Sequence, residues 1–243
     1  MTAGVLMAGA DFALANGVLF GNNKYLSKGT PYTAVSNSKK LTFGFWIKRA
    51  STGAQAIYYA GGGGELVIEF NSSNKLRIRA EVVGTSTTAL EVTTATTFND
   101  TDWHNIIASF DMGNSSNRGI YVDDASDSST WSTYTDNTLE WNVTDMSIAA
   151  DLTGSTKLNA DMAEFWLDYG TQIDLTFSAN RRPFINDNNK PGNLGVNGSL
   201  VTGNKPTIYL SGDASEWYIN KGYGGGFTLN GGALTNSTTS PAL

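Results

Sequence analysis

The segment 102–124 most constrains the possible folds, because a hydrophobic alternation stands on both sides of a short polar turn. In residues 102–111, Ile106, Ala108 and Phe110 would point to one face of a strand, and the residues between them to the other. Residues 112–118 supply the Gly, Asn and Ser that a reversing chain needs. Residues 119–124 would form the partner strand, so we predict the central hairpin of an antiparallel sandwich.

Other segments of the chain show the same strand signature. In residues 41–49, Leu41, Phe43, Phe45 and Ile47 alternate with more polar positions and predict a core face. Further strands are expected at residues 56–60, 65–70, 75–82, 146–150 and 161–169. In the last of these, strict alternation would place Met162, Glu164, Trp166 and Asp168 opposite Ala163, Phe165, Leu167 and Tyr169. With 27 Gly and 11% aromatic residues, the composition also favours an all-β protein.

Charge and cysteine content exclude several classes of partner and site. The net charge of −6 argues against a nucleic-acid partner, since phosphate binding needs a basic surface. The chain contains no Cys, which rules out disulfides, thiolate nucleophiles and Cys-ligated metals. No stretch approaches the roughly 20 apolar residues of a membrane span, so we expect no membrane insertion.

The strand pattern divides the chain into three parts. Residues 19–172 would form the sandwich, and residues 1–18 an N-terminal arm, because Asp11 interrupts its apolar run and the basic leader of a secretory signal is missing. Residues 173–243 have too little apolar material to fold alone and would pack on the sandwich or on a partner subunit. Within them, residues 174–182 predict a short helix capped by Asp174 and stopped by Pro183.

Several motifs in the predicted sandwich resemble one known family. Residues 20–26 and 43–48, the pair Trp103-His104, and residues 121–123 and 163–165 together resemble the laminin-G-like branch of the concanavalin A-like lectin/glucanase superfamily. The resemblance implies a jelly roll of two large antiparallel sheets. Parts of residues 174–227 resemble extensions found beside such domains in structural proteins of tailed bacteriophages.

The resemblance directs attention to residues 123–141 as a source of binding sites. Calcium is common in this superfamily, and Asp123, Asp124 and Asp127 could supply its oxygen ligands, or could form only a solvated acidic turn. No cofactor is required on this interpretation. Trp131, Tyr134 and Trp141 stand in the longest polar segment, residues 125–142, which reads as a loop. They could stack on sugar rings, plug the end of the sandwich or lie at a subunit contact.

An enzymatic function is the weaker interpretation. Glucanases of the superfamily carry Glu-x-Asp-x-Glu, and here Glu65 and Glu69 match the outer positions while Val67 replaces the Asp. On a regular strand the two Cα atoms would lie roughly 13 Å apart, whereas retaining hydrolysis needs carboxyl groups about 5 to 5.5 Å apart. His104, the single histidine, is expected to be structural. We therefore predict no catalytic residues.

These observations lead to one predicted function with two alternatives. The prediction is a non-catalytic virion protein of a bacteriophage, serving as a capsid decoration, fibre or tail-associated protein. Its partners would be other virion proteins, further copies of itself and possible glycans of the host surface. The alternatives are a secreted carbohydrate-binding module and a glycoside hydrolase that uses Glu65 and Glu69.

Overall fold

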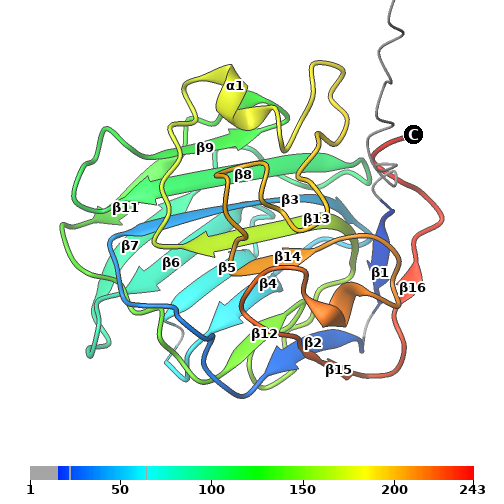
Figure 1. Cartoon of the computed structure of the whole chain (residues 1–243), viewed down its shortest axis with the longest axis horizontal. Coiled ribbons are helices and arrows are strands. Elements are labelled where there is room, and N and C mark those ends of the chain that lie inside the picture. Colours follow the sequence, from blue (N-terminus) through cyan, green and yellow to red (C-terminus); the bar gives the residue numbers. More distant parts are fainter. Residues whose placement is uncertain (1–15, 22, 64) are drawn as a thin grey trace, which may run out of the picture.

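The chain folds into two stacked antiparallel β-sheets, here called sheet A and sheet B (Figure 1). The computed structural model describes residues 16–21, 23–63 and 65–243, so nearly all of the predicted N-terminal arm lies outside the described residues. Two antiparallel sheets of eight strands each confirm the predicted all-β sandwich. None of the helices in the described part of the chain is long and apolar enough to cross a membrane.

Each sheet mixes strands from distant parts of the chain. Sheet A has the order β10 (Ala125–Ser126), β9 (Gly119–Val122), β8 (His104–Asp111), β3 (Lys40–Arg49), β13 (Ala160–Tyr169), β1 (Val18–Phe20) and β16 (Thr235–Asn236), and β14 (Ile208–Leu210) also pairs with β13. Sheet B has the order β11 (Thr130–Tyr134), β7 (Thr88–Thr93), β6 (Leu76–Glu81), β5 (Leu66–Phe70), β4 (Gln55–Ala60), β12 (Met146–Ile148), β2 (Tyr25–Lys28) and β15 (Thr228–Asn230). The helical elements are α1 (Ser178–Arg181) and the 3-10 helix η1 (Trp217–Ile219).

The predicted hairpin is present, but it does not occupy the centre of its sheet. Strands β8 and β9 pair antiparallel, with Ile106 opposite Val122. The long strands β3 and β13 follow it in the middle of the sheet, and β1 and the edge strand β16 lie beyond them. Ile106, Ala108 and Phe110 of β8 belong to the main core between the sheets, as the alternation predicted.

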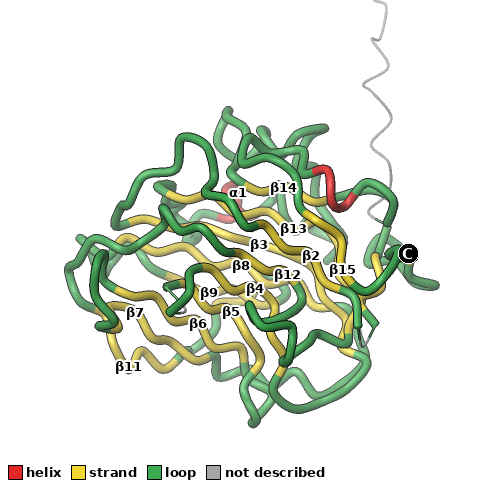
Figure 2. The backbone as a smooth tube through the Cα atoms, turned by 90° about the horizontal axis from the view of Figure 1, so that it is seen from below, coloured by secondary structure: helices red, strands yellow, loops and turns green. Residues whose placement is uncertain are grey.

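The outer face of sheet A is also buried, because part of the segment 173–243 lies across it. We call residues 173–243 the C-terminal extension, and Figure 1 shows its yellow and orange segments crossing in front of β8, β3 and β13. A second hydrophobic cluster forms beneath it, made of Trp46, Ile107, Ala163, Trp166, Leu175, Phe184, Ile185, Leu194 and Tyr209. The view turned by 90° in Figure 2 shows the same stacking of extension and sheets.

Two tryptophans of sheet A hydrogen-bond to the backbone of this cover. Trp46 Nε1 donates to the Phe184 carbonyl at 3.1 Å, and Trp166 Nε1 donates to the Gly198 carbonyl at 2.9 Å. Gly44 leaves room for the same contact: a Cβ at this position would lie 2.7 Å from a ring atom of Phe184. The extension is therefore packed as closely as a core layer.

A β-bulge in β13 changes which side chains face the core. The pairing register with β3 shifts between Ala163 and Trp166, and Glu164 between them has a positive φ of 52°. Met162 and Phe165 consequently both face the main core, although strict alternation had predicted opposite faces. The bulge lies where β13 changes its neighbour, from β1 at residues 160–162 to β14 at residues 165–167.

The bulge also places a carboxyl group in a buried position. Glu164 is 5% exposed, and its Oε2 accepts a hydrogen bond of 2.5 Å from the Tyr209 hydroxyl of β14. Burial raises the pKa of Glu164 to about 7, while the Tyr209 hydrogen bond and the charge of Lys221 oppose this rise. Burial therefore favours the protonated carboxyl group, whereas the hydrogen bond from Tyr209 favours the carboxylate.

The predicted helix at residues 174–182 is shorter than expected. Helix α1 covers only Ser178–Arg181, and its N-cap residue is Phe177, which makes no side-chain capping bond. Asp174 instead accepts hydrogen bonds from the Thr176 backbone N–H and hydroxyl. The predicted cap was wrong because the Asp174 carboxylate forms a local turn with Thr176, two residues further along, and does not cap the helix.

Gly44→Ala is expected to lower the free energy of unfolding by about 1–3 kcal/mol, because the added methyl group would collide with the Phe184 ring. Urea denaturation measures this loss. Gly62→Ala is the matched control, since a Cβ there meets no atom within 4 Å. An unchanged midpoint for Gly44→Ala would show that the extension does not press on β3.

Glu164→Gln should make the protein more stable than the wild type at pH 8.5, by roughly 1–3 kcal/mol. The folded-state pKa of about 7 lies above the ordinary value, so Glu164 costs stability as pH rises through 4.5 to 7 and ionisation is forced on a buried group. Glutamine keeps an acceptor for Tyr209 without a charge. Denaturation at pH 5 should show a much smaller difference, and equal differences at both pH values would contradict the assignment.

Candidate functional site

The three aspartates predicted to bind calcium lie around the β9–β10 hairpin, but they serve different partners. Asp123 and Asp124 form its two-residue turn, with φ of 50° and 65°. Asp and Asn tolerate this left-handed conformation, which a two-residue hairpin of this type requires at both positions. Asp123 accepts hydrogen bonds from His104 Nδ1 at 2.7 Å and from the Asn105 backbone N–H at 2.8 Å.

The Asp124 carboxylate binds two arginines of the C-terminal extension. Arg181 Nε and Arg182 Nη2 each lie 2.5 Å from one of its oxygens. Burial of Asp124 would raise its pKa, but the hydrogen bonds from both guanidinium groups prevail and hold the pKa below its ordinary value. We call this contact the Asp124 clamp, since it ties the β9–β10 turn to the extension.

Asp127 has a third set of partners. Its carboxylate accepts hydrogen bonds from the backbone N–H groups of Ala95 and Thr96, and from the hydroxyls of Thr96 and Ser129. Within residues 16–21, 23–63 and 65–243, no group of three or more His, Asp or Glu side chains is arranged to hold a metal ion. The structure thus does not bring Asp123, Asp124 and Asp127 together as a calcium ligand set.

The three predicted sugar-stacking aromatics occupy two separate places. Trp141 is 1% exposed, lies stacked on Tyr169 at 4.9 Å between ring centroids, and donates from Nε1 to Ser38 Oγ. A ring so deeply buried cannot stack on a sugar from solvent. Trp131 and Tyr134 lie on β11, an edge strand that forms within the segment predicted to be a loop.

Trp131 and Tyr134 pack around one arginine at the open edge between the sheets. The Arg118 guanidinium carbon lies 4.2 Å from the Trp131 ring centroid and 4.4 Å from that of Tyr134. Both rings are half-buried, and Trp131 also meets Phe110 of the core edge-on. This arrangement agrees with the alternative in which these aromatics plug the end of the sandwich.

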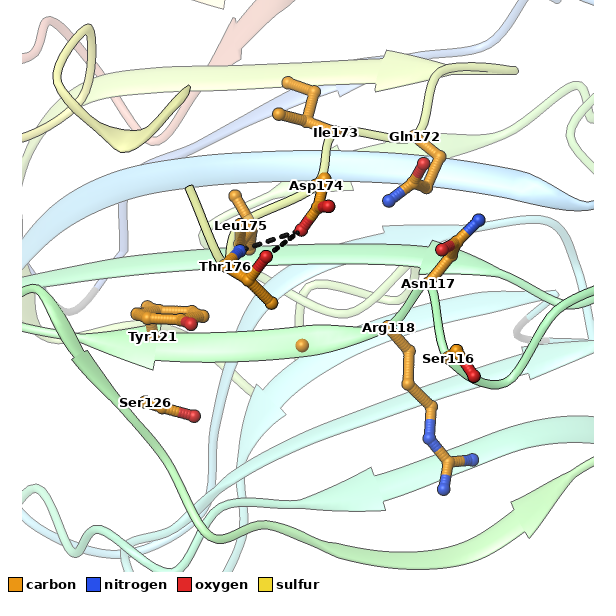
Figure 3. Close-up of a pocket in the computed structure, with 11 residues that line it drawn as sticks. Ser116, Asn117, Arg118, Tyr121, Ser126, Gln172, Ile173, Asp174, Leu175 and Thr176 are labelled. Carbon is orange, nitrogen blue, oxygen red and sulfur yellow. Dashed lines mark hydrogen bonds between the residues drawn. The ribbon is translucent and has the colours of Figure 1, made fainter. Parts of the chain in front are cut away.

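A small pocket opens beside this edge, on the outer face of sheet A (Figure 3). Its volume is about 90 Å³. One wall comes from the β8–β9 hairpin and β10, and the other from the start of the C-terminal extension. The polar and aromatic residues that line it include Asn117, Tyr121, Ser126, Gln172, Asp174 and Thr176. Arg118 also borders it, but Figure 3 shows its guanidinium group pointing away from Gln172 and Tyr121.

Two buried hydroxyls of sheet A hold the extension wall in place. Thr42 Oγ1 donates to the Thr171 carbonyl at 3.0 Å, and Ser109 Oγ accepts the Ile173 backbone N–H at 2.8 Å. The two hydroxyls also lie 2.9 Å from each other, across the β3–β8 pair. These hydrogen bonds fix the position of residues 172–176 relative to sheet A and so fix the shape of the pocket.

Most polar side chains of the pocket have no hydrogen-bond partner among the residues that the structure describes. This applies to Asn117, Tyr121, Ser126 and Gln172. Asp174 bonds Thr176 through Oδ1, which holds the pKa of its carboxyl below the ordinary value. The pocket therefore offers two amides, two hydroxyls and a carboxylate beside one aromatic ring, a set that suits a hydroxyl-rich ligand.

Comparison with known proteins identifies the family. Residues 20–169 match the family model described as the concanavalin A-like lectin/glucanases superfamily, which is more than half of the chain. The chain belongs to the concanavalin A-like lectin/glucanase superfamily. No curated protein matches the chain.

Several solved structures match the chain at low sequence identity. A protein from Bacteroides ovatus with a provisional carbohydrate-binding description has a TM-score of 0.61 and 12% identity, and the match covers 93% of this chain and 61% of that one. A pentraxin from Limulus polyphemus has a TM-score of 0.47 and 10% identity, and the match covers 65% of this chain and 77% of the pentraxin. Domains LG4-5 of the mouse laminin α1 chain have a TM-score of 0.48 and 17% identity, with 70% and 46% covered.

The chain thus spans under two thirds of the Bacteroides ovatus protein and about half of the laminin fragment. At these identities the likeness concerns the fold alone. The three proteins are a pentraxin, a protein provisionally described as carbohydrate-binding and a pair of laminin domains. The virion role stays a prediction.

The glutamates that match the superfamily's glucanase motif have other partners in this chain. Glu69 of β5 forms an ion pair with Arg77 at 2.7 Å and accepts a hydrogen bond from the Tyr59 hydroxyl. Glu65 precedes β5 and accepts the Gly63 backbone N–H. These contacts place Glu69 in an ion pair on its strand face and hold Glu65 at the turn before the strand.

The sequence predicted secondary structure for the pocket residues but no binding role. Tyr121 was assigned to a strand, and Asn117 to a turn. One signal was available: alternation in β9 puts Tyr121 on the face opposite the core residues Ile120 and Val122. Gln172 carried no signal, because only the folded chain shows that it stands opposite β9.

His104 is the first residue of β8, and its side chain is held by neighbouring residues. Its two ring nitrogens lie 2.7 Å from Asp123 Oδ2 and 2.9 Å from Asp100 Oδ1, and Phe98 packs edge-on against the ring. The hydrogen bond to Asp123, followed by the contact with Asp100, raises the pKa of His104 to about 9 against the effect of burial. An imidazolium bound on both sides is a poor general base, which agrees with the predicted structural role.

His104→Gln is expected to lower the free energy of unfolding by roughly 2 kcal/mol at pH 6. Because the folded-state pKa lies above the unfolded value of 6.5, the contribution is fully present below pH 6.5 and is lost as pH rises through 9. Denaturation at pH 6 and pH 10 should therefore show a smaller difference from wild type at pH 10.

A control for this prediction uses the fact that His104 is the single histidine of the chain. Its ring resonance in a proton NMR titration is therefore unambiguous. Wild type should titrate near pH 9, and Asp123→Asn should bring the pKa closer to 6.5. A wild-type midpoint near 6.5 would contradict the doubly bound imidazolium.

Proposed function

We propose that the chain is a non-catalytic carbohydrate-binding module and that its binding site is the pocket between β9 and residues 172–176. One observation carries the proposal: the side chains of Asn117, Tyr121, Ser126 and Gln172 converge on the pocket and lack hydrogen-bond partners in the described chain. Polar groups held ready in a fixed pocket gain bonds from a ligand without breaking bonds within the protein.

A saccharide is the class of ligand that best fits this set. Its hydroxyls both donate and accept, so they can satisfy the amides of Asn117 and Gln172 as well as the second oxygen of Asp174. The Tyr121 ring supplies an apolar surface for the carbon-bound face of a sugar. Arg181 lies on this ring with its guanidinium carbon 4.4 Å from the centroid, which keeps the ring in place.

The absence of a catalytic role is part of the proposal. The pocket has one carboxylate, Asp174, and glycoside hydrolysis by the usual mechanisms requires two. Glu69 lies on the other sheet and is bound to Tyr59 and Arg77, and Glu65 lies just before that strand and is bound to Gly63. The lectin-like fold of the superfamily supports a binding function.

Asn117→Ala and Gln172→Ala should each weaken saccharide binding by roughly fivefold to tenfold, the loss expected for one neutral hydrogen bond. Wild type is first screened on an array of neutral and acidic oligosaccharides, and dissociation constants for the bound glycans are then measured by calorimetry. Both side chains are unpaired, so the unfolding midpoints should not change.

Asn142→Ala serves as the control, because this exposed amide lies outside the pocket. The bound glycans should be recovered uncleaved by mass spectrometry. A folded wild type that binds no glycan, or binding that both pocket variants leave intact, would refute the proposed site.

A further inference from the structure

The pocket is too small to hold more than one sugar ring. Its volume is about 90 Å³, well below the roughly 300–1,000 Å³ of pockets that enclose drug-sized ligands. Further units of an oligosaccharide would therefore have to lie on the rim. The side chains around the pocket opening then decide whether the site binds a single sugar unit or a longer oligosaccharide.

An exposed aromatic residue directly follows the pocket lining in the chain. Phe177 directly follows Thr176, which lines the pocket, and it is 64% exposed. Neighbouring Cα atoms lie only about 3.8 Å apart, so the backbone of Phe177 lies directly beside the pocket wall. Phe177 belongs to neither hydrophobic cluster, and the core gains nothing from it.

The backbone around Phe177 holds this position rigidly. Phe177 is the N-cap residue of α1, and its carbonyl accepts the Asn180 backbone N–H at 3.0 Å. The next turn of the chain is fixed by the Asp124 clamp through Arg181 and Arg182. A hydrophobic ring left in solvent on an ordered backbone is accessible to a ligand, and the backbone loses little entropy when a ligand covers the ring.

We infer that Phe177 forms a second subsite, on which the next sugar unit of an oligosaccharide stacks while the first unit occupies the pocket against Tyr121. This inference rests on the proposed function and adds the class of ligand: an oligosaccharide of two or more units. Burial of the exposed Phe177 face should strengthen binding of such a chain by about tenfold over the corresponding monosaccharide.

The experiment compares wild type, Phe177→Ala and Tyr218→Ala. Tyr218 of η1 is the matched control, since it is an exposed aromatic of the extension, 42% accessible, that does not line the pocket. The probes are mono- to hexasaccharides of the gluco, galacto, manno and xylo series. Calorimetry measures their dissociation constants.

We expect wild type and Tyr218→Ala to bind the best series at least about tenfold more tightly as a disaccharide or longer than as a monosaccharide. Phe177→Ala should lose this gain and keep the wild-type affinity for the monosaccharide. Equal affinity of wild type for all lengths, or an unchanged length dependence in Phe177→Ala, would overturn the second subsite while leaving the pocket in place. Absence of binding to every series would overturn the proposed function and the subsite together.

Discussion

The burial of sheet A on both faces is the constraint on which the rest of the structure depends. Sheet B covers its inner face, and the C-terminal extension covers its outer face over Trp46, Ile107 and Trp166. Without the extension these large apolar side chains would face water, at a cost of about 25 cal/mol for each Å² exposed. The extension is therefore an integral layer of the fold, even though its own residues have little regular secondary structure.

The sequence predicts the strands of the sandwich well, because their alternation reflects a physical period of two residues. It fails where that period is broken. Glu164 gave no sign of a bulge, since the left-handed conformation of a glutamate is imposed by two different neighbours of β13 and by the Tyr209 hydroxyl. Similarly, the register shift between Trp131 and Thr133 hides the edge strand β11 within a segment that reads as a polar loop.

The candidate site was less predictable, for a different reason. Acidic and aromatic residues attract attention in a sequence, but Asp123, Asp124, Asp127 and Trp141 all have partners within the protein. The pocket depends instead on polar groups that lack partners, and this property appears only when segments about 50 residues apart are brought together. The alternation of β9 indicated that Tyr121 faces away from the core, but nothing in the sequence places Gln172 opposite it.

The Asp124 clamp has a consequence for how ligand and fold communicate. One wall of the pocket belongs to the family domain and the other to the extension beyond residue 169, and the clamp joins them through Arg181 and Arg182. A ligand held between the walls adds its binding free energy to that of the clamp. Binding of a ligand in the pocket and attachment of the extension are then linked equilibria. Ligand binding strengthens the attachment of the extension, and an attached extension strengthens ligand binding.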